Sequence, residues 1–384
     1  MQPRIILIMP LNVLSTELCQ IYDSAGGATL EASINGHIAS CPVGTSKSAH
    51  EAPIAPVAQA LRAFEKAKKE LLGSFTQASF DAKLSKLMPK LGAQATTALS
   101  LAFYNSEQSA KPIAGNTFPA LLGNVLGGGA HATGSTKLSI QEILVMHRAK
   151  TLATAIEMNF KIWRAVGDAL AKRGPCGLNC EAAWTADISN EAALELVCKL
   201  AKKARALVGV DIAASHFYKN GTYAWSDRTL SRDAHIARVL GFVKKYGLSY
   251  VEDPLHQEDF AGFSSIVQAV KGQALVCGDD LVATNIDRLK RAAREHAVDA
   301  VIIKPNQTGT VSGALAVIAH ATKNKITPVL SHRSRETPDT SVCALAQLCP
   351  IAKLGVAGIR TVKLNGLLRL WRLAPKPKIT KLRI

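Results

Sequence analysis

ALVGVD (206–211) is the first of six short apolar segments that each end in one polar side chain; the other five are LSYVE (248–252), ALVCGD (274–279), AVIIK (300–304), ITPVLSH (326–332) and PIAK (350–353). Stretches with helical periodicity lie between most of these segments. A barrel of parallel β/α units places the C-terminal ends of its strands on one face, so residues far apart in sequence meet there. The pattern therefore predicts an α/β fold, a TIM-type β/α barrel whose strand ends carry an active site.

The first part of the chain has a different pattern. Residues 1–50 alternate apolar and polar side chains between Gly-rich turns, which is typical of a small antiparallel sheet. Residues 54–112 have apolar side chains at helical spacing. A chain of 384 residues is long enough for a barrel and one smaller domain. We therefore expect an α+β N-terminal domain over residues 1–120 and the barrel over residues 121–384.

Helical spacing also covers residues 140–172, where we expect a long helix. From residue 191 onward, predicted helices and strands alternate regularly. Ser231 and Asn285 stand where two of these helices begin. Both residue types stabilise a helix start because their side-chain oxygens accept hydrogen bonds from its free amides. We therefore predict that they are N-caps.

The cysteines indicate the compartment. There are eight, and they form no CxxC pair and no zinc-finger spacing. We interpret them as mostly free thiols of a reducing environment. No apolar run is long enough to span a bilayer. The sequence therefore predicts a cytoplasmic protein without a membrane span; an organelle is the alternative, because the chain is basic and its N-terminus is apolar.

The net charge of +17 is high, and part of it is local. After Asp339 the chain contains no acidic residue, and it ends in the basic segment PKPKITKLRI (375–384). We interpret this tail as a solvated surface, since no aromatic-rich RNA motif accompanies the charge. The alternative is contact with nucleic acid, acidic lipid or an acidic protein partner.

Three carboxylates close consecutive predicted strands, namely Asp211, Glu252 and Asp279. Neighbouring carboxylates repel one another unless a cation lies among them, and hard oxygen ligands select Mg²⁺ over softer metals. The alternative is that one acid belongs to the site while the other two lie in surface turns. Because three consecutive strands share the feature, we predict a magnesium site.

Basic residues close the following strands. Lys304 ends a fully apolar strand, where burial and a nearby cation would lower its pKa toward the range of a general base. A salt bridge to a metal-ligand carboxylate is the alternative role. His332, Arg333 and Ser334 offer hydrogen-bond donors for a phosphate or carboxylate, and Lys353 adds another cation. Three acids and four cations suit a doubly anionic substrate whose reaction builds up negative charge.

The longer segments around these residues resemble enolase over nearly the whole chain. In the family's order, the matching segments are IYDSAGGATLEASI (21–34), CPVGTSKSAHEA (41–52), NVLGGGAH (124–131), IQE (140–142), VEDPLHQEDF (251–260), GDDLVATN (278–285), IIKPNQTGTVSGAL (302–315) and SHRSRETPDT (331–340). The resemblance implies a hydro-lyase of glycolysis, phosphopyruvate hydratase. Its reaction is the reversible dehydration of 2-phospho-D-glycerate to phosphoenolpyruvate, with two Mg²⁺ ions in each active site.

The resemblance also implies roles for individual residues. The metal ligands are Asp211, Glu252, Asp279 and Ser46. The catalytic residues are Lys304, which removes the C2 proton, Glu181, which helps to expel the C3 hydroxyl with Glu142 beside it, and His332. The substrate-binding residues are His131, Glu142, Arg333, Ser334 and Lys353. The family is usually dimeric, so a homodimer is expected.

The chain departs from the family's pattern at a few positions. Asn179-Cys180-Glu181-Ala182-Ala183 stands where the family has Gly-Asp-Glu-Gly-Gly, and Lys47-Ser48 stands where the mobile loop has Thr-Gly. Arg335 replaces a Gly and could add a phosphate contact or crowd the substrate, while Ala25 replaces an Arg of the first hairpin. These changes and the basic tail motivate an alternative function. It is an inactive or weakly active enolase-like protein that serves as a binding or structural component, on RNA or in a large assembly.

Overall fold

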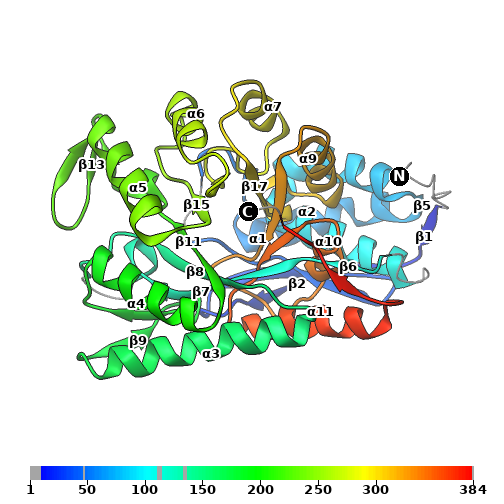
Figure 1. The fold of residues 1–384 in the computed structure, drawn as a ribbon. Coiled ribbons are helices and arrows are strands. Elements are labelled where there is room, and N and C mark those ends of the chain that lie inside the picture. Colours follow the sequence, from blue (N-terminus) through cyan, green and yellow to red (C-terminus); the bar gives the residue numbers. More distant parts are fainter. Residues whose placement is uncertain (1–9, 46–47, 110–114, 133–135, 383–384) are drawn as a thin grey trace.

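The computed structural model describes residues 10–45, 48–109, 115–132 and 136–382 (Figure 1). Its N-terminal part contains a three-stranded antiparallel sheet of β2 (Thr16–Tyr22), β3 (Ala28–Ile34) and β4 (His37–Ser40). The remaining elements of this part are β1 (Leu11–Val13), α1 (Val57–Ala67), the 3-10 turn η1 (Lys68–Leu71), β5 (Gly73–Phe75) and α2 (Gln77–Ser109). Alternate residues of β3 are buried against α2, as the period of the sequence predicts.

Eight strands of the described chain close a barrel, which confirms the predicted fold. Their order is β7 (Ala120–Gly127), β8 (Glu142–His147), β11 (Ala206–Asp211), β15 (Tyr250–Glu252), β16 (Leu275–Gly278), β17 (Ala300–Ile303), β18 (Thr327–Ser331) and β19 (Ile351–Lys353). The last strand pairs with the first, with Ile351 opposite Ala120, so the sheet has no free edge there. The six strands predicted from polar-ended segments are the last six of this ring.

One strand contradicts the prediction of a parallel barrel. β8 runs antiparallel to both of its neighbours, β7 and β11. Residues 142–147 were predicted as the start of a helix that runs to residue 172, and this is wrong, because the helix α3 begins only at Leu152. The run from Ile143 to Met146 is buried on both faces of the barrel wall. A strand that is apolar on both faces has no period of two, so its sequence cannot be told from a buried helix.

The antiparallel direction of β8 has a consequence for the site. Its first residue, Glu142, lies opposite Asp211, which is the last residue of β11. Glu142 therefore reaches the same barrel face as the C-terminal ends of the parallel strands. Glu142, the first residue of its strand, thus lies beside the predicted side chains that end the neighbouring strands.

The helices that follow the strands pack around the outside of the barrel (Figure 1). They are α3 (Leu152–Ala171), α4 (Asn190–Lys203), α5 (Arg232–Tyr246), α6 (Phe260–Ala269), α7 (Ile286–Arg294), α8 (Pro305–Thr308), α9 (Val311–Lys323), α10 (Val342–Ala346) and α11 (Arg360–Leu373). Both predicted N-caps are confirmed. The Ser231 hydroxyl accepts from the Ala234 amide, and the Asn285 side chain accepts from the amides of Asp287 and Arg288.

Short elements complete the chain. A hairpin of β9 (Cys176–Leu178) and β10 (Trp184–Ala186) extends the sheet beside β7, and 3-10 turns lie at η2 (Gly129–His131) and η3 (Ala214–Phe217). β12 (Tyr218–Lys219), β13 (Thr222–Ala224) and β14 (Thr229–Ser231) form a small separate sheet. No helix in the described ranges is long and apolar enough to cross a membrane.

The basic tail lies against the barrel in its described part, residues 375–382. β20 (Lys378–Ile379) pairs with β6 (Thr117–Phe118), directly before the first barrel strand. Ile379 and Leu382 pack against the side chains that fill the barrel interior, which include Met146 and Tyr250. The tail therefore lies at the barrel end opposite the strand termini that carry Asp211 and Lys353.

Candidate active site

The side chains at the C-terminal strand ends surround a tight cavity of about 20 Å³. It is lined by His131, Gln141, Glu142, Glu181, Asp211, Asp279, Lys304, Ser331, His332, Arg333, Ser334 and Lys353. All the site residues predicted from the sequence lie here except two. Glu252 is fully buried and bonded to Lys353, and Ser46 lies outside the described residues.

Lys353 is bound by carboxylates from three neighbouring strands. Its Nζ lies 2.7 Å from Glu252 Oε1, 3.0 Å from Asp211 Oδ2 and 3.2 Å from Glu142 Oε2. Tyr250, inside the barrel, donates its hydroxyl hydrogen to the other Glu252 oxygen at 2.6 Å. These buried pairs hold the pKa of Lys353 well above its usual range despite desolvation by burial.

Lys304 forms a second ion pair, with Asp279. The sequence predicted a lowered pKa for Lys304 beside a bound cation, and this stays a prediction; the protein's own groups act in the opposite direction. Burial acts to lower the pKa of Lys304, but the Asp279 carboxylate outweighs burial and raises it. The side chain therefore carries its proton as long as Asp279 is its direct partner.

Carboxylates crowd these strand ends. Burial and the neighbouring Asp211 raise the pKa of Glu252 to about 8, and burial and Asp279 raise the pKa of Asp280 to about 7. Asp253, Asp279 and Asp280 each place one oxygen within 4.8 Å of the others. A divalent cation relieves such crowding of hard oxygen ligands. The donor set at these strand ends therefore fits a hard divalent metal.

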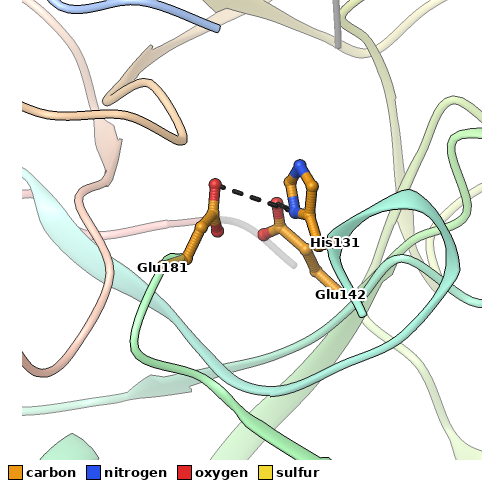
Figure 2. Close-up of side chains that lie close together, drawn as sticks. All are labelled: His131, Glu142 and Glu181. Atoms are coloured by element: carbon orange, nitrogen blue, oxygen red, sulfur yellow. Dashed lines mark ion pairs between the residues drawn. The ribbon is translucent and has the colours of Figure 1, made fainter. Parts of the chain in front are cut away.

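A second cluster combines His131 with two carboxylates, Glu142 and Glu181, which point toward one another (Figure 2). His131 Nδ1 lies 3.6 Å from Glu142 Oε1 and 3.8 Å from Glu181 Oε1. Neither ring nitrogen of His131 has a hydrogen-bond partner among the described residues, although the side chain is almost fully buried. Buried polar groups normally have partners, so these atoms mark a position for a bound molecule.

The two carboxyls of this cluster differ in their tendency to hold a proton. Burial and the nearby Glu181 raise the pKa of Glu142 well above its usual range. For Glu181, burial acts in the same direction, but His131, His332 and Arg360 outweigh it and lower its pKa. Neighbouring carboxyls with separated pKa values allow one to act as acid while the other stays ionised.

The phosphate-binding residues predicted at 333–334 contact the N-terminal domain. Arg333 donates to both carboxylate oxygens of Glu51 at 3.1 Å. The Thr45 amide donates to the Ser334 hydroxyl oxygen at 2.8 Å. Gly44 allows this approach, because a Cβ there would lie 1.8 Å from an Arg333 nitrogen. Gly44, Thr45 and Glu51 therefore lie over the strand ends, and an anion that binds Arg333 must compete with Glu51.

Comparisons with known proteins agree with this geometry. The family described as "Enolase, C-terminal TIM barrel domain" matches residues 116–373. The chain belongs to the enolase family. The enolase of Natronomonas pharaonis is 35% identical to this chain over an alignment 393 residues long. The alignment covers 93% of this chain and 98% of that protein. The enolases of Halobacterium salinarum (36% identical, 91% and 96% covered) and Picrophilus torridus (34% identical, 94% and 99% covered) are similar over the same extent.

Membership of the enolase family makes the chain an enzyme of the lyase class, and it implies a divalent metal. The carboxylate-rich strand ends agree with that implication. The relatives align over nearly their full length, so the matching segments found in the sequence belong to one continuous enolase chain.

Arg360 is a site residue that the sequence did not reveal. It is 1% exposed, and its guanidinium donates to His332 Nδ1 (3.2 Å) and to the carbonyl oxygens of Cys180, Arg333 and Ser334. It thereby joins the loop that carries Glu181 to the predicted phosphate loop. Because His332 Nδ1 accepts this bond, the ring proton lies on Nε2, which is 3.7 Å from Glu181 Oε2.

The loop around Glu181 departs from the enolase pattern but keeps an ordered turn. The Asn179 side-chain oxygen accepts from the amides of Glu181 (2.9 Å) and Ala183 (3.0 Å). Ala182 has a φ of 58°, in the left-handed region where the family has Gly. The family's glycines would adopt this turn easily. In their absence, the hydrogen bonds to Asn179 stabilise it. Asn124, also unforeseen, donates to Glu181 Oε2 at 3.1 Å.

Arg335 takes neither role considered for it from the sequence. Its guanidinium pairs with Asp23 at 2.9 Å, and it does not line the cavity. The contact is close to Gly27, where a Cβ would lie 1.5 Å from Arg335 Nη2. The hairpin that has lost the family's Arg at Ala25 is thus held by an arginine from the opposite loop.

Proposed function

We propose that this enolase catalyses the Mg²⁺-dependent, reversible dehydration of 2-phospho-D-glycerate to phosphoenolpyruvate, as a phosphopyruvate hydratase of glycolysis. The observation that carries the proposal is that Lys304, two of the predicted carboxylate ligands (Asp211 and Asp279) and Arg333 line one buried cavity. The C2 proton of the substrate is very weakly acidic. Only concentrated positive charge beside the substrate carboxylate makes its removal feasible.

The metal is proposed to be two Mg²⁺ ions, which supply this positive charge when bound. Asp211, Glu252 and Asp279 would hold the first, and Ser46 would contribute to the second. The Asp279 carboxylate would then interact with a metal ion as well as with Lys304. The pKa of Lys304 would fall as a result, which a base requires.

The protein's own groups would move the protons. Lys304 Nζ takes the C2 proton, and the electron pair of that C–H bond forms the C2=C3 double bond. The C3–O bond breaks, and the hydroxyl leaves as water after it receives a proton from the Glu142 and Glu181 pair. Glu142 has the raised pKa of this pair, so it holds that proton before the reaction.

The remaining residues would bind and orient the substrate. Arg333 and Ser334 are proposed to hold the phosphate, which must displace Glu51 from Arg333. Lys353 would contact the substrate carboxylate. His131 and His332 would line the pocket on the side of Glu181, where neither ring nitrogen of His131 has a hydrogen-bond partner in the described part of the chain. Holding the reactants in one geometry contributes much of the rate.

The test is turnover of 2-phosphoglycerate by the purified chain, followed by the ultraviolet absorbance of phosphoenolpyruvate. We expect turnover with Mg²⁺ and none after exhaustive chelation. A chain that binds Mg²⁺ but produces no phosphoenolpyruvate would contradict the proposal. Lys304→Ala should remove turnover without unfolding the protein, and retained turnover would refute its role as base.

Three further expectations from the sequence are kept as proposals. The enzyme is proposed to act in the cytoplasm and to form the homodimer usual for the family. Contact of the basic tail with nucleic acid or an acidic protein belongs to the alternative function as a binding component. Salt-sensitive RNA binding that is lost on removal of residues 374–384 would favour that alternative; binding no stronger than that of an unrelated basic protein would argue against it.

A further inference from the structure

A second cavity lies at the barrel end opposite the active site, and its volume is about 450 Å³. Its walls come from the start of β7, the end of β8 with the turn after it, the start of β11, and the C-terminal tail around β20. The volume is within the range of roughly 300–1,000 Å³ that is typical of small-molecule sites. The tail residues 378–382 form one side of it, so the docked tail creates the cavity.

The inner surface of this base cavity is apolar. Ala120 and Met146 belong to the buried packing of the barrel interior, and Leu207, Ile379 and Leu382 pack against that interior from the rim. Each of these side chains presents carbon to the cavity. Burial of an apolar body here would remove hydrocarbon surface from water, with a gain of about 25 cal/mol per Å².

The rim of the base cavity is basic. Arg148, Lys150, Lys378 and Lys381 line it and are exposed to solvent, and no Asp or Glu of the described residues lines it. Two of the cations follow β8 and two belong to the tail, so they surround the opening from both sides. Their charges lie next to an apolar wall of low dielectric, which strengthens their attraction for an anion.

His147 adds a polar group to the same lining. Its Nδ1 is buried and has no hydrogen-bond partner among the described residues. An unpaired buried ring nitrogen is uncommon in a folded protein. A hydroxyl or amine hydrogen on a bound molecule would satisfy it.

We propose that the base cavity binds a small amphipathic anion, a molecule with an apolar body and one carboxylate, sulfonate or phosphate group. The apolar body occupies the inner surface of Met146, Leu207 and Ile379, and the anionic group lies at the rim between Lys150, Lys378 and Lys381. The site is separate from the enolase active site and does not depend on the proposed reaction. Its ligand could come from two sources with the same chemistry, a free carboxylic acid or a phosphate ester.

The experiment uses the fluorescence of 8-anilinonaphthalene-1-sulfonate, an aromatic body with one sulfonate, added to the full-length folded chain. We expect saturable binding at one site per chain, displaced by decanoate or by decyl phosphate. The stronger of these two competitors identifies the preferred anionic group. Displacement by inorganic phosphate at the same concentration would overturn the proposal, because it would show a site for charge alone.

Variants locate the site. The double variant Lys378→Glu, Lys381→Glu should weaken binding about tenfold or more, because two attractive charges become repulsive. Ala149→Trp, which changes no charge, should fill the cavity and abolish binding. The matched control Lys69→Glu, Lys86→Glu has the same change in charge on exposed positions of the N-terminal part, outside the base cavity, and should bind like the wild type.

Two outcomes would refute the site. Undiminished binding by Ala149→Trp would place the probe elsewhere, and equal weakening by both double variants would indicate a general charge effect. Thermal unfolding of every variant is measured in parallel. If Ala149→Trp does not fold, the comparison of the two double variants still decides the proposal.

Discussion

Replacement of Arg360 tests how the two catalytic loops are held together. The guanidinium is 1% exposed and donates to four acceptors, one ring nitrogen and three carbonyl oxygens. Arg360→Met leaves these buried acceptors without a donor. A hydrogen bond from a charged donor contributes about 1.5–3 kcal/mol, but bonds in one network do not add fully. We therefore expect the free energy of unfolding to fall by about 3–5 kcal/mol.

The same variant should lose more activity than stability alone explains. Arg360 connects the Cys180 carbonyl, next to Glu181, with the carbonyls of Arg333 and Ser334. A displacement of about 1 Å in catalytic groups lowers kcat about a hundredfold. Burial lowers the pKa of His332 to about 3; Glu181 acts against this shift, and the Arg360 cation adds to it. Loss of this cation therefore raises the pKa of His332.

Urea unfolding and steady-state kinetics of three variants separate these effects. Arg360→Lys keeps the charge but has a single nitrogen, so it should regain part of the stability and little of kcat. The control is Arg369→Met, an exposed position of the same helix, which should change stability by less than about 0.5 kcal/mol. Wild-type kcat in Arg360→Met would refute the reasoning, and so would a stability loss as small as that of Arg369→Met.

Three further predictions concern other parts of the chain. Asn179→Ala removes the acceptor for the amides of Glu181 and Ala183, so kcat should fall about tenfold or more while KM changes little; a change in KM alone would contradict this role. Burial lowers the pKa of His235 to about 4, so the folded state binds fewer protons than the unfolded state. The contribution of neutral His235 to stability is therefore complete above about pH 6.5 and is lost as the pH falls toward 4. Urea unfolding should therefore show that, between about pH 7 and pH 5, the wild type loses about 2 kcal/mol more of its free energy of unfolding than His235→Gln does. Equal pH dependence of the two proteins would contradict this prediction. Arg335→Gly should leave KM for 2-phosphoglycerate within about threefold, because Arg335 contacts Asp23 instead of the cavity; a rise beyond about tenfold would show that it contacts substrate.

The strand ends were predictable because barrel topology makes their chemistry local in sequence. An apolar run followed by one polar residue predicts a strand. It also predicts that the polar side chain lies at the barrel face where the active site forms. Asp211, Lys304 and Lys353 were found in this way, and the structure brings them into one cavity. β8 was missed because it is buried on both faces and reversed, so Glu142 begins a strand where the pattern sought residues that end one.

The supporting residues were not predictable, since their roles depend on contacts between distant segments. Arg360 and Lys363 belong to the region after Asp339 that contains no acidic residue, yet both are buried. Lys363 pairs with Glu336 and also donates to two carbonyls, which no spacing indicates. The raised pKa of Lys304 likewise depends on its direct contact with Asp279, which the sequence leaves open.

The central claim is that Lys304 removes the C2 proton of 2-phosphoglycerate at a site of bound Mg²⁺. Exchange of that proton with deuterium in D₂O, measured by proton NMR with the wild type and Lys304→Ala, tests this step apart from the loss of water. We predict Mg²⁺-dependent exchange with the wild type and none with Lys304→Ala. Exchange at the wild-type rate in Lys304→Ala, or exchange by the wild type that persists after complete removal of divalent metal, would contradict the account.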